Sequence, residues 1–337
     1  MKNILTIMLS LLLFTSLAAC SSNNKNNAEE SKSLTVYSPH PSETINLIVQ
    51  EFEKKSGIKV EIVAAGTGEL LKRVDSEKDN PLGDVLWGGG AESLQAYAQL
   101  FEPYKSPELV NIDAKYYASD NSWTGESPLP MVILYNTNLV SNPDAVKSWS
   151  DVLKPEFKGK IAMADPAKSG SSYTILATML TAYKTQNDGW DFIKDFYGNL
   201  DGKILSSSSG VYKGVADGEY ALGLTLEKEA IKFVNAGSPV KIVYPSEGTS
   251  AVPDGVAIIK GAKNIDNAKK FIDFVLSKET QTLMAEQLSR RSIRNDVDAP
   301  KGLGPLAEIK LVDYDFSWAS NSKETNLNNW KEILVGK

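Results

Sequence analysis

Three serines and one glycine at positions 169–172 form the most chemically suggestive segment of the sequence. They stand between the turn-forming pair Asp165-Pro166 and a strongly apolar run. Helix capping and turn formation use one or two of these hydroxyl groups, and the surplus needs another explanation. A helix N-terminus offers unpaired backbone N–H groups and partial positive charge, so added hydroxyl donors predict an anion-binding site that needs no lysine.

Polar and glycine-rich loops recur where expected strands end, and these loops supply the candidate ligand-binding residues. In open α/β sheets, ligands bind beyond the carboxyl ends of the strands. The candidates are Ser38, Thr67, Gly68, Glu69, Gly89, Gly90, Ser169, Gly170, Ser171, Ser172, Ser208, Ser209, Gly210, Lys228, Glu229 and Glu247. Plainer roles compete for several of them: the serines at 206–209 also suit a polar surface loop, and Lys228 also suits a solvated helix face.

Segments with the character of strands alternate with segments of helical periodicity. The runs LTVYS (34–38), IKVEIVAAG (58–66) and DVLWGGG (84–90) are strand candidates, and KIAMAD (160–165) opens a second set. After the first run, Ile45, Ile48, Val49 and Phe52 follow the i, i+3, i+4, i+7 spacing of a helix. This alternation predicts an α/β fold in which helices flank the sheets on both faces.

The length of 337 residues suits two lobes with separate cores. Strand-like segments at 130–136 and 248–256 are the expected crossings between the lobes. We therefore assign residues 34–132 plus 255–337 to lobe 1 and residues 133–254 to lobe 2. Part of the C-terminal tail is expected to pack on lobe 2.

The N-terminus has the pattern of an export signal. Lys2 precedes an apolar core from Ile4 to Leu13, and the ending Leu17-Ala18-Ala19-Cys20 resembles the lipobox of bacterial lipoproteins. We expect a signal peptide over 1–20, lipidation of Cys20 and a flexible tether over 21–33. The protein would then be lipid-anchored to the cell membrane, facing the extracellular or periplasmic side, without disulfides because Cys20 is its only cysteine.

Several classes of function are disfavoured by the composition. The formal net charge of -6, without a long basic tract, argues against nucleic-acid binding. His40 is the only histidine, and no nucleophile-elbow, HExxH, P-loop or dinucleotide-binding motif accompanies it. We expect a binding protein that is not an enzyme and has no cofactor or resident metal.

Four segments together resemble one family over nearly the whole mature chain. They are LTVYSPHPSETINLIVQEFEKKSGIKVEIVAAGTGELLKRV, NPLGDVLWGGG, GKIAMADPAKSGSSYT and EGTSAVPDGVAIIKGAKNIDNAKKFIDFVLSKETQ. They are similar to the bacterial extracellular solute-binding proteins of ABC importers, in the branch that contains ferric-binding, hexose-phosphate-binding, phosphonate-binding and thiamine-binding relatives. The resemblance implies a two-lobed type II periplasmic-binding-protein fold, with each lobe a mixed sheet flanked by helices and the ligand cleft between lobes. It also implies an ABC permease as partner and a monomeric state.

The resemblance has different consequences for different ligands. Glu69 matches the glutamate of the ferric binders, but His40 lies one position from their histidine, and TLEKEA (225–230) replaces their tyrosine pair. Fe³⁺ favours anionic oxygen ligands, so loss of both phenolates counts against iron. In the sugar-phosphate binders, a His-Asp pair occupies the positions of Lys228 and Glu229, and Glu247 matches a further glutamate. We expect a small organophosphorus anion, a sugar phosphate or a phosphonate such as aminoethylphosphonate; ferric iron is the alternative, and a thiamine binder or secreted hydrolase is less favoured.

Overall fold

The computed structural model describes residues 32–336, and the chain from Lys32 onward forms one compact unit. The expected signal peptide, the lipidation site Cys20 and most of the expected tether lie outside the described residues. The first strand begins at Ser33, which is the last residue of the expected tether. Among the described residues, no helix combines the length and apolar character needed to cross a membrane.

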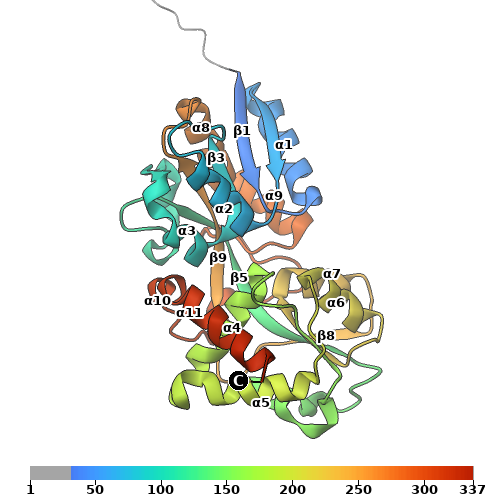
Figure 1. Ribbon diagram of the computed structural model, residues 1–337. Coiled ribbons are helices and arrows are strands. Elements are labelled where there is room, and N and C mark those ends of the chain that lie inside the picture. Colours follow the sequence, from blue (N-terminus) through green and yellow to red (C-terminus); the bar gives the residue numbers. More distant parts are fainter. Residues whose placement is uncertain (1–31, 337) are drawn as a thin grey trace, which may run out of the picture. The chain divides into compact units, whose positions relative to one another are not determined.

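One half of the fold, here called lobe 1, is built on parallel strands in the order β2-β1-β3, with β9 antiparallel to β3 (Figure 1). Its strands are β1 (Ser33–Ser38), β2 (Lys59–Ala64), β3 (Val85–Gly90), β4 (Phe101–Glu102) and part of β9 (Ala251–Ile259). Its helices are α1 (Ser42–Ser56), α2 (Thr67–Ser76), α3 (Ala91–Ala96), α8 (Ile265–Leu276) and α9 (Lys278–Leu288).

The other half, here called lobe 2, is centred on β5, which pairs antiparallel with β7 and with β8, while β6 runs parallel to β7. Its strands are β5 (Thr124–Asn136), β6 (Ile161–Ala162), β7 (Leu222–Leu226) and β8 (Val240–Val243). Its helices are α4 (Gly170–Ala182), α5 (Trp190–Leu200), α6 (Ser208–Ala216) and α7 (Glu227–Asn235). The predicted α/β architecture with mixed, helix-flanked sheets is confirmed.

The strands β5 and β9 connect the two lobes. The first part of β5, Thr124 to Pro130, pairs with β9, whereas Met131 to Asn136 pairs with β7 and β8. β5 begins six residues before the predicted segment because the proline-containing stretch before Met131 still pairs with β9, through a register shift between Gly125 and Ser127. Prolines normally weaken a strand prediction because they lack a backbone donor, yet Pro128 and Pro130 lie here in continuous register with Pro253 and Ala251.

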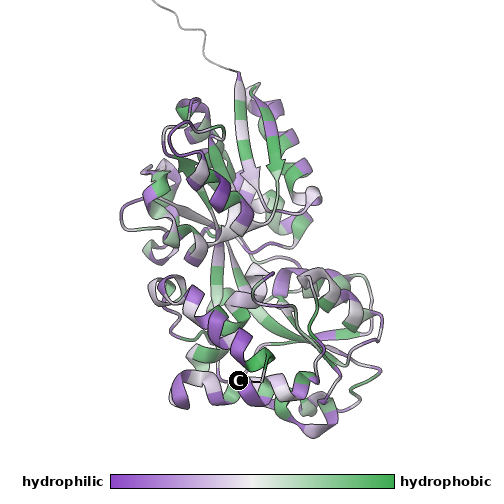
Figure 2. Cartoon of the chain, viewed as in Figure 1, coloured by the Kyte–Doolittle hydropathy of each residue, from purple (hydrophilic) through white to green (hydrophobic). Residues whose placement is uncertain are grey.

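Side chains of successive strand residues point to opposite faces of the sheet and so pack in different hydrophobic cores. In lobe 1, Val36 packs in the cluster of α1, α8 and α9, while the next residue, Tyr37, packs with α2 and α3. In lobe 2, Ile133 packs with α4 and α5, while Leu134 packs with α6 and α7. Helices therefore cover both faces of each sheet, and the hydrophobic stripes of those helices are visible in Figure 2.

The C-terminal helices α10 (Phe316–Asn321) and α11 (Lys323–Leu334) belong to both lobes. Tyr314 and Phe316 pack against the α2–α3 core of lobe 1. Trp330, which is 1% exposed, is part of the α4–α5 core of lobe 2. The C-terminal segment therefore joins the two cores a second time, independently of β5 and β9.

Candidate functional site

The loops that end β1 and β3 and begin α2 meet in lobe 1. Ser38 is fully buried, and its hydroxyl donates to the carbonyl oxygen of Trp87 over 2.8 Å, which ties the end of β1 to β3. Gly89 has a φ of +88°, and a Cβ there would lie 2.5 Å from Cγ2 of Thr67. The glycine run therefore serves the close approach of three loops, and Ser38, Thr67 and Gly89 lie where these loops meet.

The N-terminus of α4 presents the serine segment from lobe 2. The hydroxyl of Ser169 accepts from the backbone N–H of Ser172 at 3.3 Å, and it lies 3.1 Å from the hydroxyl of Ser171. Ser169 thus has the ordinary capping role, and Ser172 is buried. The half-buried Ser171 and the exposed Gly170 leave a hydroxyl and first-turn N–H groups at the helix start.

The α4 loop has neighbours in both lobes. Thr174 donates from Oγ1 to Oε1 of Glu92, a lobe 1 residue on α3, over 2.7 Å. On the other side, the N–H of Asp165 donates to the carbonyl oxygen of Leu205 at 2.9 Å, which places the segment leading into α6 beside it. Ser208, Ser209 and Gly210, the first residues of α6, are half-buried.

Lys228, on the first turn of α7, is a buried ammonium with few partners. The residue is 8% exposed, and its Nζ lies 3.8 Å from Asp254 Oδ2 and 3.9 Å from Glu229 Oε1, both beyond hydrogen-bond distance. Within the described part of the chain, Nζ donates no hydrogen bond. Burial, with the nearby charge of Arg290, lowers the pKa of Lys228, and the carboxylates of Asp254 and Glu229 act in the opposite direction.

Lys228 borders a charged network of His40, Glu126, Asp254 and Arg290 around the crossing strands. Of these residues, the sequence pattern singles out His40 but not Glu126 or Asp254. Arg290 Nη2 lies 2.7 Å from Glu126 Oε1 and 3.1 Å from Asp254 Oδ2, and His40 Nε2 lies 2.8 Å from the same Glu126 oxygen. The indole of Trp87 donates to the other oxygen of Glu126 over 2.7 Å. Burial alone would raise the pKa of Glu126, but the charges of Arg290 and His40 outweigh it and lower this pKa to about 2.

Arg291, the next residue, makes a different contact. Its Nε and Nη2 donate to the two oxygens of Glu227 over 2.6 and 2.8 Å, and its Nη1 donates to the carbonyl oxygen of Gly304 over 2.8 Å. Tyr244 also donates to Glu227. Every polar atom of this buried pair has a partner, so it fixes the start of α7 and thereby the position of Lys228.

Two of the predicted glutamates are not brought to Lys228. Glu247 accepts from the backbone N–H groups of Trp149 and Ser150, at 3.1 and 3.2 Å, and from the hydroxyl of Tyr183. These donors all belong to lobe 2, so the structure gives the Glu247 carboxylate a local structural role. Glu69 and Gly68 are exposed on the first turn of α2. Glu229, by contrast, lies beside Lys228 and 3.8 Å from Lys232 Nζ.

A metal ion is a poor match for the acidic groups of this network. The ligand atoms of His40, Glu126 and Asp254 lie within 4.8 Å of one another, which metal coordination would require. However, Arg290 occupies oxygens of both carboxylates, and Lys228 approaches Asp254 as well.

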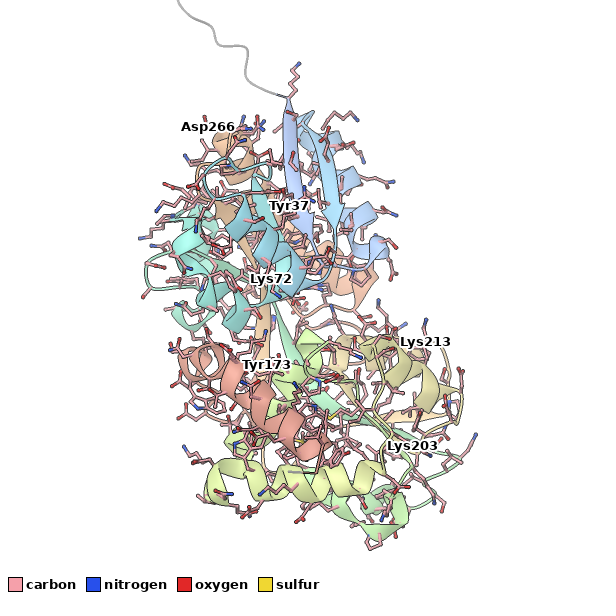
Figure 3. All side chains as sticks on the ribbon, viewed as in Figure 1. Tyr37, Lys72, Tyr173, Lys203, Lys213 and Asp266 are labelled. Atoms are coloured by element: carbon pink, nitrogen blue, oxygen red, sulfur yellow. The ribbon has the colours of Figure 1, made fainter. Side chains whose placement is uncertain are left out.

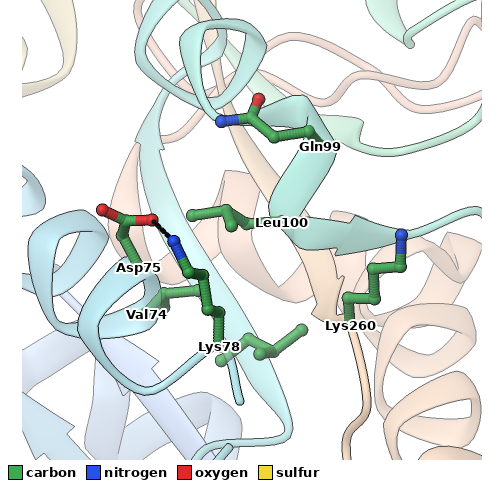
Figure 4. A pocket seen from close by; sticks show the side chains of 7 residues that line it. Val74, Asp75, Lys78, Gln99, Leu100 and Lys260 are labelled. Atoms are coloured by element: carbon green, nitrogen blue, oxygen red, sulfur yellow. Dashed lines mark ion pairs between the residues drawn. The ribbon is translucent and has the colours of Figure 1, made fainter.

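Two cavities lie outside this set of residues. One, of about 360 Å³, is formed by α2 and the end of β9, with Lys78 near Asp75 on one side and Lys260 on the other (Figure 4). The other, of about 630 Å³, is lined by the end of α4, by Trp190 at the start of α5, and by the C-terminal helices, including Trp318. Neither contains a predicted ligand-binding residue.

Comparison with known proteins adds the evolutionary context. A family model described as bacterial extracellular solute-binding protein matches residues 48–307. A putative 2-aminoethylphosphonate-binding periplasmic protein of Salmonella paratyphi A is 28% identical over 84% of this chain and 85% of its own length. The structure of the periplasmic binding protein AfuA of Actinobacillus pleuropneumoniae, with exogenous fructose-6-phosphate bound, has a TM-score of 0.83 at 27% identity, covering 90% of this chain and 99% of AfuA. A ferric binding protein of Campylobacter jejuni has a TM-score of 0.79 at 26% identity, covering 89% and 99%.

Proposed function

Because the chain belongs to the family of bacterial extracellular solute-binding proteins, we propose that it captures a small organophosphorus anion and delivers it to the permease of an ABC importer. The solute is a sugar phosphate or a phosphonate such as aminoethylphosphonate, held between lobe 1 (34–132 plus 255–337) and lobe 2 (133–254). The protein acts by binding and release, and closure of the lobes over the solute is the expected motion.

The observation that carries this proposal is the buried ammonium of Lys228. A buried charge without hydrogen-bond partners is costly, and among the described residues the carboxylates closest to Lys228 Nζ lie at 3.8 and 3.9 Å. An anionic oxygen of the solute would supply the missing partner through a charge-assisted hydrogen bond. Such a contact offsets the cost of burying Lys228, which no neighbouring side chain does by hydrogen bonding within the described residues.

Other predicted ligand-binding groups offer chemistry that suits the same solute. The starts of α4 and α6 offer hydroxyl groups and helix N-termini, which favour phosphoryl oxygens. Glu229 beside Lys228 suits a sugar hydroxyl or an ammonium group. Support also comes from relatives whose names and titles refer to 2-aminoethylphosphonate and fructose-6-phosphate.

Ferric iron is the second candidate, favoured by the ferric binding relative and by the proximity of His40, Glu126 and Asp254. The charges around these residues count against it. Arg290 bonds to both carboxylates, and a trivalent cation would have to displace it or lie against it. The organophosphorus solute is therefore the better supported of the two.

The cellular setting is part of the same proposal. Lipid attachment through Cys20 would hold the monomer at the outer face of the cytoplasmic membrane, and the 21–33 segment would tether the lobes beside the permease. Metabolic labelling with a fatty-acid analogue, compared with a Cys20→Ala variant, tests the anchor separately from solute binding.

Calorimetry on the mature chain tests the solute class. Glucose 6-phosphate, 2-aminoethylphosphonate, inorganic phosphate, thiamine and Fe³⁺ are titrated in turn into protein that was unfolded and refolded to remove retained solute. We expect heat and a single site with at least one phosphorus compound. Tight Fe³⁺ binding with a visible absorption band, and no heat with any phosphorus compound, would overturn the proposal.

A further inference from the structure

A second group of buried polar side chains lies at the start of α3, beside the α4 serine segment. Glu92 is 2% exposed, and its Oε1 accepts from Thr174 over 2.7 Å. Its Oε2 is buried and has no hydrogen-bond partner in the described part of the chain. The same Thr174 hydroxyl lies 3.2 Å from the carbonyl oxygen of Gly170. Glu92 is therefore one helical turn from the anion-binding site proposed at the start of α4.

The C-terminal segment supplies the other members of the group. The hydroxyl of Tyr314 is buried and, among the described residues, likewise has no partner. Lys323 donates from Nζ to the hydroxyl of Ser93 over 3.2 Å, and its Nζ lies 4.9 Å from the ring centre of Tyr173, the residue labelled at the start of α4 in Figure 3. Burial raises the pKa of Tyr314 well above its ordinary value, and the charge of the nearby Glu92 adds to this effect.

The backbone leaves room for this group at one position. A Cβ on Gly90, a predicted ligand-binding residue, would lie 2.8 Å from Oε2 of Glu92. With glycine at this position, the Glu92 carboxyl group turns toward the end of β3 without a clash. The unpartnered Glu92 oxygen thus borders the same strand end as Gly89 and Thr67.

We infer that Glu92 and Tyr314 form a subsite for hydroxyl groups of the solute, which makes the solute a sugar phosphate rather than an aminoalkylphosphonate. This inference rests on the proposed function. It assigns a binding role to the C-terminal segment, through Tyr314, which packs against the core that contains the first residues of α3. It also gives a reason for two buried polar atoms, Glu92 Oε2 and Tyr314 Oη, that lack partners among the described residues.

The chemistry of the group selects hydroxyls over an ammonium. A hydroxyl both donates and accepts, so it can pair with Glu92 Oε2 whether or not that carboxyl is protonated, and with Tyr314 Oη. An ammonium cannot accept from the phenol, and it would lie near the like charge of Lys323. Burial also raises the pKa of Glu92, which reduces the negative charge available to balance a cation.

Competing solutes and two variants test the inference by calorimetry. In the unmodified mature chain, glucose 6-phosphate should bind at least about tenfold more tightly than 2-aminoethylphosphonate or inorganic phosphate. Tyr314→Phe should weaken glucose 6-phosphate by about tenfold, the effect of one good hydrogen bond, and leave inorganic phosphate within about twofold. Tyr197→Phe, which removes a hydroxyl near the carbonyl oxygen of Leu334, is the matched control and should change neither.

Lys323→Met tests the charge argument separately. It should raise the affinity for 2-aminoethylphosphonate relative to glucose 6-phosphate by about fivefold, since it removes the repulsion of the solute ammonium. A thermal unfolding curve for each variant shows that it is folded.

The outcomes separate failure of the hydroxyl subsite from failure of the proposed function. Tighter binding of 2-aminoethylphosphonate than of glucose 6-phosphate, or an equal effect of Tyr314→Phe on all three compounds, overturns the hydroxyl subsite and leaves the proposed function standing. Absence of binding by every phosphorus compound removes the proposed function, and the subsite with it.

Discussion

Two sets of buried charged residues near the start of α7 differ in how many of their polar atoms are hydrogen-bonded. One set is Glu227 with Arg291, and the other is Lys228 with Arg290. Glu227 and Arg291 exchange two hydrogen bonds, and Tyr244 and Gly304 occupy their remaining polar atoms. Lys228 follows Glu227 in the sequence and Arg290 precedes Arg291, but the polar atoms of Lys228 and Arg290 are not all hydrogen-bonded. Lys228 has no hydrogen bond, and Arg290 leaves Nε and Nη1 unpartnered within the described residues.

This difference separates structural charge from charge available for binding. Both pairs are buried, so burial does not distinguish them. Hydrogen-bond satisfaction does, because a fully paired buried charge stabilises the position of an element, whereas an unpaired one is held at a cost. The fully paired residues thus fix α7, and Lys228, without such partners, is the residue that we propose contacts the solute.

The largest expected effect comes from breaking the satisfied pair. Arg291→Ala leaves the Glu227 carboxylate buried without its charge partner, and we expect a loss of about 3–5 kcal/mol in the free energy of unfolding. Urea denaturation in the absence of solute measures it. The double variant Glu227→Ala/Arg291→Ala should lose less than the sum of the single variants. Lys331→Ala, on an exposed position of α11, should stay within about 0.5 kcal/mol, and a similarly small loss in Arg291→Ala would refute the structural assignment.

Acid should destabilise the protein by protonating Glu126, the carboxylate that accepts a hydrogen bond from Arg290. The pKa of Glu126 is about 2 in the fold against an ordinary 4.5, so the unfolded chain takes up this proton first as the pH falls. The stability that Glu126 confers is complete above pH 4.5 and is lost as the pH falls from 4.5 toward 2. It amounts to about 3 kcal/mol at 1.36 kcal/mol per unit of pKa.

Urea denaturation at pH 6, 4 and 3 measures this acid dependence. Glu126→Gln should lower stability at pH 6, because Arg290 loses its counter-charge, and should flatten the decline between pH 6 and 3. Glu286→Gln, on an exposed position of α9, is the control and should keep the decline of the unmodified protein. An unchanged decline in Glu126→Gln would show that Glu126 is not the acid-sensitive group.

Removing the underpaired ammonium should affect binding and spare the fold. Lys228→Met should weaken glucose 6-phosphate or 2-aminoethylphosphonate by about 10- to 100-fold, the range of a buried charge-assisted hydrogen bond. Its melting temperature should equal or exceed that of the unmodified protein, because a largely buried charge that makes no hydrogen bond to the described residues is gone. Calorimetry and a thermal melt measure the two quantities. Lys213→Met, at an exposed position of α6 labelled in Figure 3, should change neither, and unchanged affinity in Lys228→Met would contradict the proposed site.

Much of the fold could be predicted from local patterns. Strands such as β1 and β3 are buried on both faces, so they appear as continuous apolar runs, and helices such as α8 keep a regular apolar spacing. The strand-end rule then selected the loops that meet at Gly89 and Thr67. The start of β5 was the clearest difference, because its prolines hid a stretch that pairs with β9.

The charged part of the site could not be predicted in the same way. Glu126 and Arg290 are 164 positions apart, and nothing near either residue indicates the other. In the sequence, Arg290 is one of three arginines at positions 290, 291 and 294, and Asp254 lies in the segment Pro253-Asp254-Gly255. Glu247 shows the opposite problem: its position suits a ligand contact, yet the backbone N–H groups of Trp149 and Ser150 occupy it. Partners of this kind are set by tertiary packing.

The smallest expected effects lie within the serine segment, where the same distinction applies to single hydroxyl groups. Ser169 accepts from the Ser172 N–H, so Ser169→Ala should cost about 1 kcal/mol of stability and change affinity little. Among the described residues, the Ser171 hydroxyl has one side-chain hydrogen-bond partner, the Ser169 hydroxyl. Ser171→Ala should therefore leave the free energy of unfolding within about 0.5 kcal/mol and lower the affinity for an organophosphorus solute about fivefold. Urea denaturation and calorimetry on both variants measure the two effects. The reverse pattern would mean that the capping hydroxyl, rather than the surplus one, meets the solute, and that satisfaction by neighbours does not separate structural groups from binding groups in this protein.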